Sequence, residues 1–115
     1  MADMNVLAAG WLAPLGGEAR LSHAYPDDFS RLPAVCWQET GNEPAAYADD
    51  GAYMDAVAVQ VDVWAEGPEQ AGALAGRADA LMAAQGMRRT YRADAPDPSG
   101  LAHKVMAYRG ALAAP

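Results

Sequence analysis

Alternating valines at four positions from Val57 to Val63 constrain the fold more than any other feature of this sequence. Successive side chains of a β-strand point to opposite faces, so all four valines lie on one side of an extended segment. Their β-branched side chains favour the extended backbone and pack well against a second layer. The residues between them are small or polar and end at Trp64. We therefore predict a strand over 53–64 whose valine face is buried, with Trp64 in the core beneath an N-terminal helix.

The segment 68–85 has the pattern of an amphipathic helix. Pro68 suits the first helical position, where no backbone N–H is needed, and Glu69 suits the positive end of the helix dipole. Apolar side chains recur at helical spacing along one face: Ala71, Leu74, Ala75, Ala78, Leu81 and Met82. Gly86 stands where a left-handed C-terminal cap is expected, with Met87 folding back on the helix.

The N-terminal part of the chain predicts a shorter helix and two strands. The helix covers 4–13, with Asp3 as its cap and Pro14 as its end. A short edge strand is expected over 19–24. A second strand is expected over 33–39, because apolar and polar residues alternate there.

Two more strands are predicted near the C-terminus. The segments 87–93 and 101–109 flank a turn, 94–100, that is rich in Pro, Asp, Ser and Gly. Strands joined in this way form an antiparallel hairpin. The composition of 40–55 predicts a long acidic loop, and the tail 110–115 is expected to fray.

These elements predict an α+β fold. Strands joined by short connections favour an antiparallel sheet, and two helices need one face of it for burial. We expect a two-layer sandwich in which a mainly antiparallel sheet of about four strands packs with two helices. The 115 residues fit one domain, 1–115, with a core that needs no disulfide. The apolar runs are far shorter than the ~20 residues of a membrane helix, and no secretory signal is visible.

Charge is distributed unevenly along the chain. The whole sequence carries −7, but residues 1–75 hold 12 acidic and 2 basic side chains, a net charge of −10. Residues 76–115 hold 6 basic and 3 acidic side chains, a net charge of +3. The acidic balance argues against tight binding of nucleic acid. The uneven distribution of charge allows one copy to meet another through oppositely charged surfaces. A solvated surface with a local basic patch explains the same distribution equally well.

The sequence offers little for catalysis or metal binding. Cys36 and His103 could in principle form a thiol site, but no base stands near Cys36 in the sequence, and a buried cysteine is usually inert. Asp49, Asp50 and Asp55 lack the spacing of a calcium loop. No spacing indicates a zinc or iron site, a phosphate loop or a cofactor site. We expect a protein that is not an enzyme.

The order of several segments matches a known pattern. The strand at 53–64 ends in Val-Asp-Val-Trp, the next helix ends at Gly86, and the last strand carries His-Lys at 103–104 and Tyr-Arg at 108–109. Upstream lies the Pro-led strand that begins at Leu32. In this order the chain resembles the small tail-terminator proteins of long-tailed phages, also called tail-completion or head–tail joining proteins.

The resemblance implies a structural role in the virion, at the tail–neck junction. Such proteins form a hexameric ring on the head-proximal end of the tail tube and stop its polymerisation. The implied partners are further copies of the chain, the tail tube protein and the head–neck connector protein, with DNA only passing through the lumen. Assembly would take place in the cytoplasm of the bacterial host, without a membrane or a cofactor.

A ring needs two different complementary faces on each subunit. Arg88 and Arg92 are expected to share one face of their strand, which Lys104 extends. The acidic loop is the expected counterpart on the next subunit. The candidate interface residues are thus Arg88, Arg92, Lys104, Asp49, Asp50 and Asp55.

Three other interpretations remain open at this stage. The chain could be a different neck or head-completion adaptor, with another partner in the same particle. It could be a small ligand-binding module whose Trp and Tyr side chains line a pocket. It could also be a small enzyme that uses Cys36 and His103.

Overall fold

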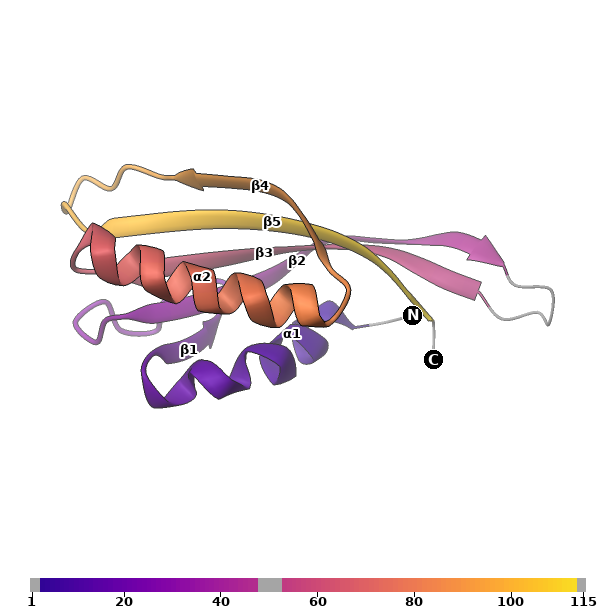
Figure 1. Ribbon diagram of the computed structural model, residues 1–115, viewed down its shortest axis with the longest axis horizontal. Coiled ribbons are helices and arrows are strands. Elements are labelled where there is room, and N and C mark those ends of the chain that lie inside the picture. Colours follow the sequence, from indigo (N-terminus) through magenta and orange to yellow (C-terminus); the bar gives the residue numbers. More distant parts are fainter. Residues whose placement is uncertain (1–2, 48–52, 114–115) are drawn as a thin grey trace.

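The computed structural model describes residues 3–47 and 53–113, which form a sheet with helices on one of its faces (Figure 1). In chain order the elements are α1 (Met4–Leu12), the 3-10 helix η1 (Ala13–Gly17), β1 (Arg20–His23), β2 (Ala34–Tyr47), β3 (Tyr53–Ala65), α2 (Pro68–Ala84), β4 (Arg88–Asp94) and β5 (Ala102–Ala113). The five strands lie in the order β1-β2-β3-β5-β4. Neighbouring strands are antiparallel except β1 and β2, which are parallel. The predicted α+β fold with a mainly antiparallel sheet is confirmed, and each of the five predicted strand segments contributes a strand.

The valines of β3 form the centre of the core, as their alternation predicted. Each is at most 3% exposed. On β2, Trp37 lies opposite Val61, and on β5 Met106 and Tyr108 lie opposite Val61 and Val59. These side chains point to the layer that contains α1 and α2. Burial of an aliphatic side chain of this size is worth about 1.5–3 kcal/mol, so this face supplies much of the stability.

Helix α2 covers the valine face and ends as its sequence predicted. Its buried residues form one stripe, namely Ala71, Leu74, Ala75, Ala78 and Met82. Gly86 has φ +80°, in the left-handed region. The Met87 N–H donates to the Met82 carbonyl at 3.2 Å, and the Gly86 N–H donates to the Ala83 carbonyl at 2.9 Å. These two bonds are those of a Schellman ending, which turns the chain back toward β4.

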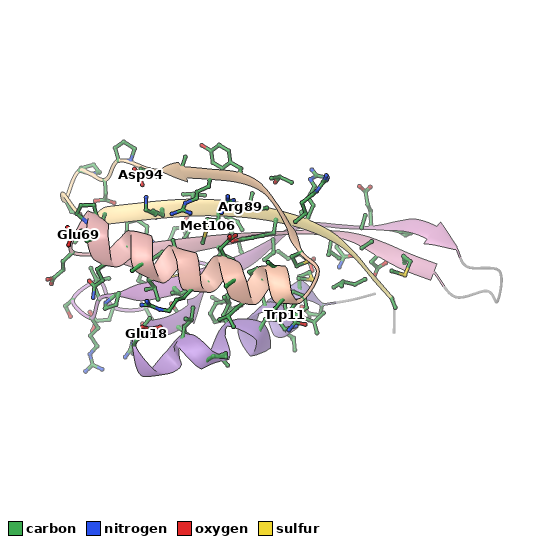
Figure 2. The ribbon with its side chains drawn as sticks, viewed as in Figure 1. Trp11, Glu18, Glu69, Arg89, Asp94 and Met106 are labelled. Carbon is green, nitrogen blue, oxygen red and sulfur yellow. The ribbon has the colours of Figure 1, made fainter. Side chains whose placement is uncertain are left out.

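Helix α1 confirms the expected N-terminal helix. The Asp3 carboxylate accepts a hydrogen bond from the Asn5 N–H at 3.0 Å and caps the helix. Its buried face consists of Met4, Ala8 and Leu12. Arg77 of α2 forms an ion pair of 2.7 Å with Glu18, which directly follows η1 (Figure 2). This pair joins the N-terminal helical segment to α2.

The prediction of a loop over 40–55 is wrong for the residues of this segment that the structure describes, 40–47 and 53–55, because they belong to strands. β2 continues to Tyr47 and β3 begins at Tyr53, so the two strands form a long arm that runs beyond the helices (Figure 1). Gly, Asn and Pro residues in this segment gave it the composition of a loop. The strand accommodates them through irregularities of register at Thr40 and Ala45.

The C-terminal tail is also more ordered than expected. β5 continues to Ala113, which lies opposite Met54 of the arm. The expectation of a frayed tail over 110–115 is therefore wrong for 110–113, and residues 114–115 lie outside the described chain. The reason is the length of β3, which offers these residues a pairing partner along its whole extent.

Candidate subunit interface

The face of the sheet opposite the helices is its open face. On β3 this face carries Ala56, Ala58, Gln60, Asp62 and Trp64, the residues that alternate with the valines. Near the arm it is lined by small side chains, whereas its other end is covered by the segment between β1 and β2. The open face is therefore the surface through which this sheet could meet another molecule.

The covered end of the open face forms a small second core. Trp64 stacks on His103 with ring centroids 3.6 Å apart, and the Phe29 ring meets Trp64 edge-on at 5.2 Å. His103 Nε2 lies 2.9 Å from an Asp62 oxygen, and Gln60 donates to the other oxygen at 2.8 Å. Trp64 is buried as expected, but on the face away from α1, because even positions of β3 point away from the valines.

Cys36 belongs to this second core and is not exposed. The pKa of its thiol is raised to about 11, mainly by burial and to a lesser extent by the nearby Asp62 carboxylate, against the lowering effect of the Ser22 hydrogen bond. At neutral pH the side chain is a thiol and not a nucleophilic thiolate. The geometry of Cys36 and His103 therefore favours a packing role for both residues.

A shallow groove crosses the open face where the arm leaves the body. Its volume is about 490 Å³. It is lined by small residues and by two opposite charges: Thr40, Gly41, Glu43, Ala56, Val57, Ala58, Arg109 and Gly110. The charges belong to Glu43 of β2 and Arg109 of β5, which border the same hollow.

Arg88 and Arg92 do not share a face of β4. Arg88 lies opposite Arg109, whereas Arg92 lies opposite Met106, which is buried against the helices. A bulge between Arg89 and Tyr91 shifts the register and moves the later residues to the opposite side. Arg88 is thus on the open face and Arg92 on the helix side, which corrects the expected common surface.

The other candidate interface residues are also dispersed. Lys104 lies on the helix side, where it forms an ion pair with Asp94 of its own chain. Asp55 is 1% exposed. Asp49 and Asp50 lie outside the described residues. The structure therefore leaves two exposed arginines from this set, Arg88 and Arg92, on opposite faces of one edge strand.

Sequence reasoning missed Arg109 as the neighbour of Arg88. Both guanidinium groups are exposed, and neither has an ion-pair partner among residues 3–47 and 53–113. The signal that could have found the pair is the register of the hairpin. The sequence does not reveal that register, because it does not show the bulge between Arg89 and Tyr91. Counting residues back along β4 from the turn, with strict alternation of faces, gives a different pairing with β5.

The helix side of β4 and β5 is closed by a polar bridge to α2. Arg89 forms an ion pair with Asp79 at 3.1 Å, and the Tyr108 hydroxyl donates to the other Asp79 oxygen at 2.7 Å. Figure 2 places Arg89 and Met106 together beside α2. Burial and the neighbouring Asp79 carboxylate raise the pKa of Tyr108, so it remains a hydrogen-bond donor. This side of the hairpin is therefore structural.

The part of the chain that the structure describes holds no group of three or more side chains able to bind a metal ion together. Among the same residues, neither helix has the length and hydrophobicity that a membrane crossing requires.

Comparison with known families adds a decisive observation. The sequence profile of the tail completion protein gp17 family matches residues 7–111, nearly the whole chain. The chain belongs to this family. As a tail-completion protein it has a structural role in a phage-type virion, as the resemblance implied. Among curated protein sequences, none matches the chain significantly.

The fold of this tail-completion protein also occurs in a solved particle. It is similar to a chain in the structure described as the virion of a native gene transfer agent particle, with a TM-score of 0.63 and 15% sequence identity. The match covers 90% of this chain and 84% of that chain. At this identity the likeness establishes a shared fold.

Proposed function

We propose that this tail-completion protein caps the head-proximal end of the tail tube, ends tube polymerisation and joins the tail to the head–neck connector as a hexameric ring. The single observation that carries the proposal is the family match over residues 7–111. The role requires surfaces for copies of itself and for two different protein partners, and it requires no catalysis.

The shape of the chain supports a role in assembly. The arm formed by β2 and β3 extends beyond the helices, and the molecule measures 51 Å along its longest axis against 24 and 21 Å across (Figure 1). An extended arm gives a subunit reach toward neighbours that a compact body lacks. The acidic side chains of the arm and the arginines of β4 are the proposed contacts between subunits, together with Asp49 and Asp50, which lie outside the described residues.

The test is deletion of the gene from a genome that produces particles, followed by electron microscopy. We expect DNA-filled heads beside separate tails of abnormal length, and normal particles when the wild-type gene is supplied on a plasmid. Separate tails of normal length would favour a neck adaptor that joins without terminating. Normal, infectious particles from the deletion strain would refute the proposed function.

A further inference from the structure

Two strands of the sheet have an uncovered edge. β1 pairs with β2 only as far as Trp37, so no strand within residues 3–47 and 53–113 borders the later part of β2 on that side. β4 forms the opposite edge of the sheet. The molecule therefore has two different lateral surfaces, one along the arm and one along β4.

The charges on these two edges are opposite. Glu43 of β2 is exposed, and it has no ion-pair partner in the described parts of the chain. On the other edge stands Arg88 of β4, and its neighbour Arg109 lies one strand further in, on β5. Both are exposed, and neither has an acidic ion-pair partner in the described parts of the chain. Like charges directly opposite each other across two strands are destabilising. A carboxylate placed between these two guanidinium groups would remove their repulsion.

The registers place these charges on one face of the sheet. Glu43 pairs with Ala56 of β3, and Ala58, two residues further along, pairs with Arg109. Two residues along a strand span about 7 Å, and three strand spacings separate β2 from β4 by about 14 Å. Glu43 and Arg88 thus lie on opposite edges of the open face, about 7 Å apart along the strands and about 14 Å apart across them.

The edges are shaped against extension of the backbone ladder. β2 carries Pro44, which has no N–H, between register shifts at Thr40 and Ala45. β4 carries its own bulge between Arg89 and Tyr91. Bulges and proline are common means of preventing edge-to-edge strand pairing. A contact between these edges would therefore be made by side chains.

We propose that Glu43 of one copy forms ion pairs with Arg88 and Arg109 of the next copy, in a head-to-tail contact between the arm edge and the β4 edge. Glu43 and Arg88 lie on opposite edges of one sheet, so a contact between them is heterologous and repeats from copy to copy. It rests on the self-assembly included in the proposed function. The occupant of each edge is a second copy, because one edge carries the charge complementary to the other.

Charge exchange tests this contact in particles. Glu43→Arg, or Arg88→Glu together with Arg109→Glu, is expected to lower the titre of infectious particles by about 100-fold, since each places like charges across the contact. Combining all three substitutions in one chain restores opposite charges and is expected to return the titre to within about tenfold of wild type. Glu66→Arg, an exposed acid away from both edges, is the matched control and retains the titre.

Disulfide trapping tests the same contact without relying on function. In a Cys36→Ala background, Glu43→Cys and Arg88→Cys in one chain should give a ladder of covalent oligomers, in purified protein at high concentration or in assembled particles. A mixture of the two single-cysteine chains should give only dimers, and Glu66→Cys with Arg88→Cys should give monomers. Each variant is checked by circular dichroism for the wild-type fold.

The outcomes separate this contact from the proposed function. If deletion disturbs the tails but the folded charge variants retain the titre, the contact is refuted and the function stands. If deletion of the gene leaves the particles normal, the proposed function is refuted. Disulfide trapping in purified protein then decides by itself whether the proposed contact between copies exists. Dimers from Glu43→Cys alone would refute the head-to-tail geometry. Loss of titre with the arginine variants but not with Glu43→Arg, without rescue, would refute it in favour of another ligand such as the DNA that passes by.

Discussion

The Tyr108 hydroxyl of β5 donates a hydrogen bond of 2.7 Å to the Asp79 carboxylate of α2. Tyr108 is 1% exposed, and Asp79 also holds Arg89 of β4. One carboxylate of the helix thus fixes both strands of the C-terminal hairpin. Because this fixes α2 over the helix side of β4 and β5, the open face of the same hairpin remains as the free surface that carries Arg88 and Arg109.

The bond between Tyr108 and Asp79 should contribute measurably to stability. Tyr108→Phe removes the donor while keeping the ring, and Asp79 retains its ion pair with Arg89. A hydrogen bond to a charged group is worth about 1.5–3 kcal/mol, so we expect a loss at the lower end of that range in urea unfolding. Tyr91→Phe, which alters an exposed tyrosine on the open face, is the control and should leave the midpoint unchanged. Equal midpoints for both variants would contradict the assignment.

The raised pKa of Cys36 predicts a specific dependence of stability on pH. The thiol has an ordinary value of 9.0, and in the fold its pKa is about 11. A group whose pKa is raised by folding contributes its full stabilisation below the unfolded value and loses it as the pH rises toward the folded value. We therefore expect the free energy of unfolding to fall between pH 9 and 11 for wild type. Cys36→Ala, compared by urea unfolding at each pH, should show a weaker decline.

Thiol labelling checks the burial of Cys36 independently. At pH 8 the folded protein should react with an aromatic disulfide reagent far more slowly than the urea-unfolded protein, because the thiol is buried and protonated. Phe29→Ala removes the ring that packs edge-on against Trp64 over this second core, and should accelerate labelling. Rapid labelling of the wild-type protein at pH 8 would contradict the described packing.

The left-handed residue after α2 provides a fourth prediction. Gly86 has φ +80°, a conformation that other residues adopt only with strain, and no neighbouring atom would obstruct an added Cβ. Gly86→Ala should therefore destabilise the protein by about 1 kcal/mol through backbone strain alone. Gly76→Ala, in the interior of α2 with equally open surroundings, should instead be neutral or stabilising. The two unfolding midpoints, measured side by side, separate conformational strain from packing.

Local sequence patterns predicted those elements in which neighbouring residues all favour the same secondary structure. The alternation of Val57–Val63 predicted both the strand and its buried face, and Pro68 with Gly86 bounded α2 closely. The arm was missed because Gly, Asn and Pro residues indicate a loop when taken alone, whereas a long partner strand and two register shifts keep this segment in the sheet. Pairing between distant strands was the missing information.

The candidate site was harder to predict than the fold. Arg88 was singled out as a candidate interface residue and is exposed, but its neighbour depends on the bulge between Arg89 and Tyr91, which no local pattern specifies. A shift of one residue moves Arg92 to the other face, since side chains alternate along a strand. The charge difference between the two halves of the chain was visible in the sequence. The assignment of individual charges to the edges of the sheet required the pairing registers of the strands.

The Arg88 and Arg109 pair predicts an unusual effect of a charge reversal on the isolated chain. Arg88→Glu places a carboxylate directly opposite Arg109, replacing repulsion by attraction across β4 and β5. We expect this variant to be more stable than wild type by about 0.5–1 kcal/mol in urea at low salt, with a smaller difference at 1 M salt where exposed charges are screened. Arg92→Glu, whose register partner is the uncharged Met106, should lack this gain. No gain in stability with Arg88→Glu would contradict the repulsion between Arg88 and Arg109 from which the proposed contact is argued.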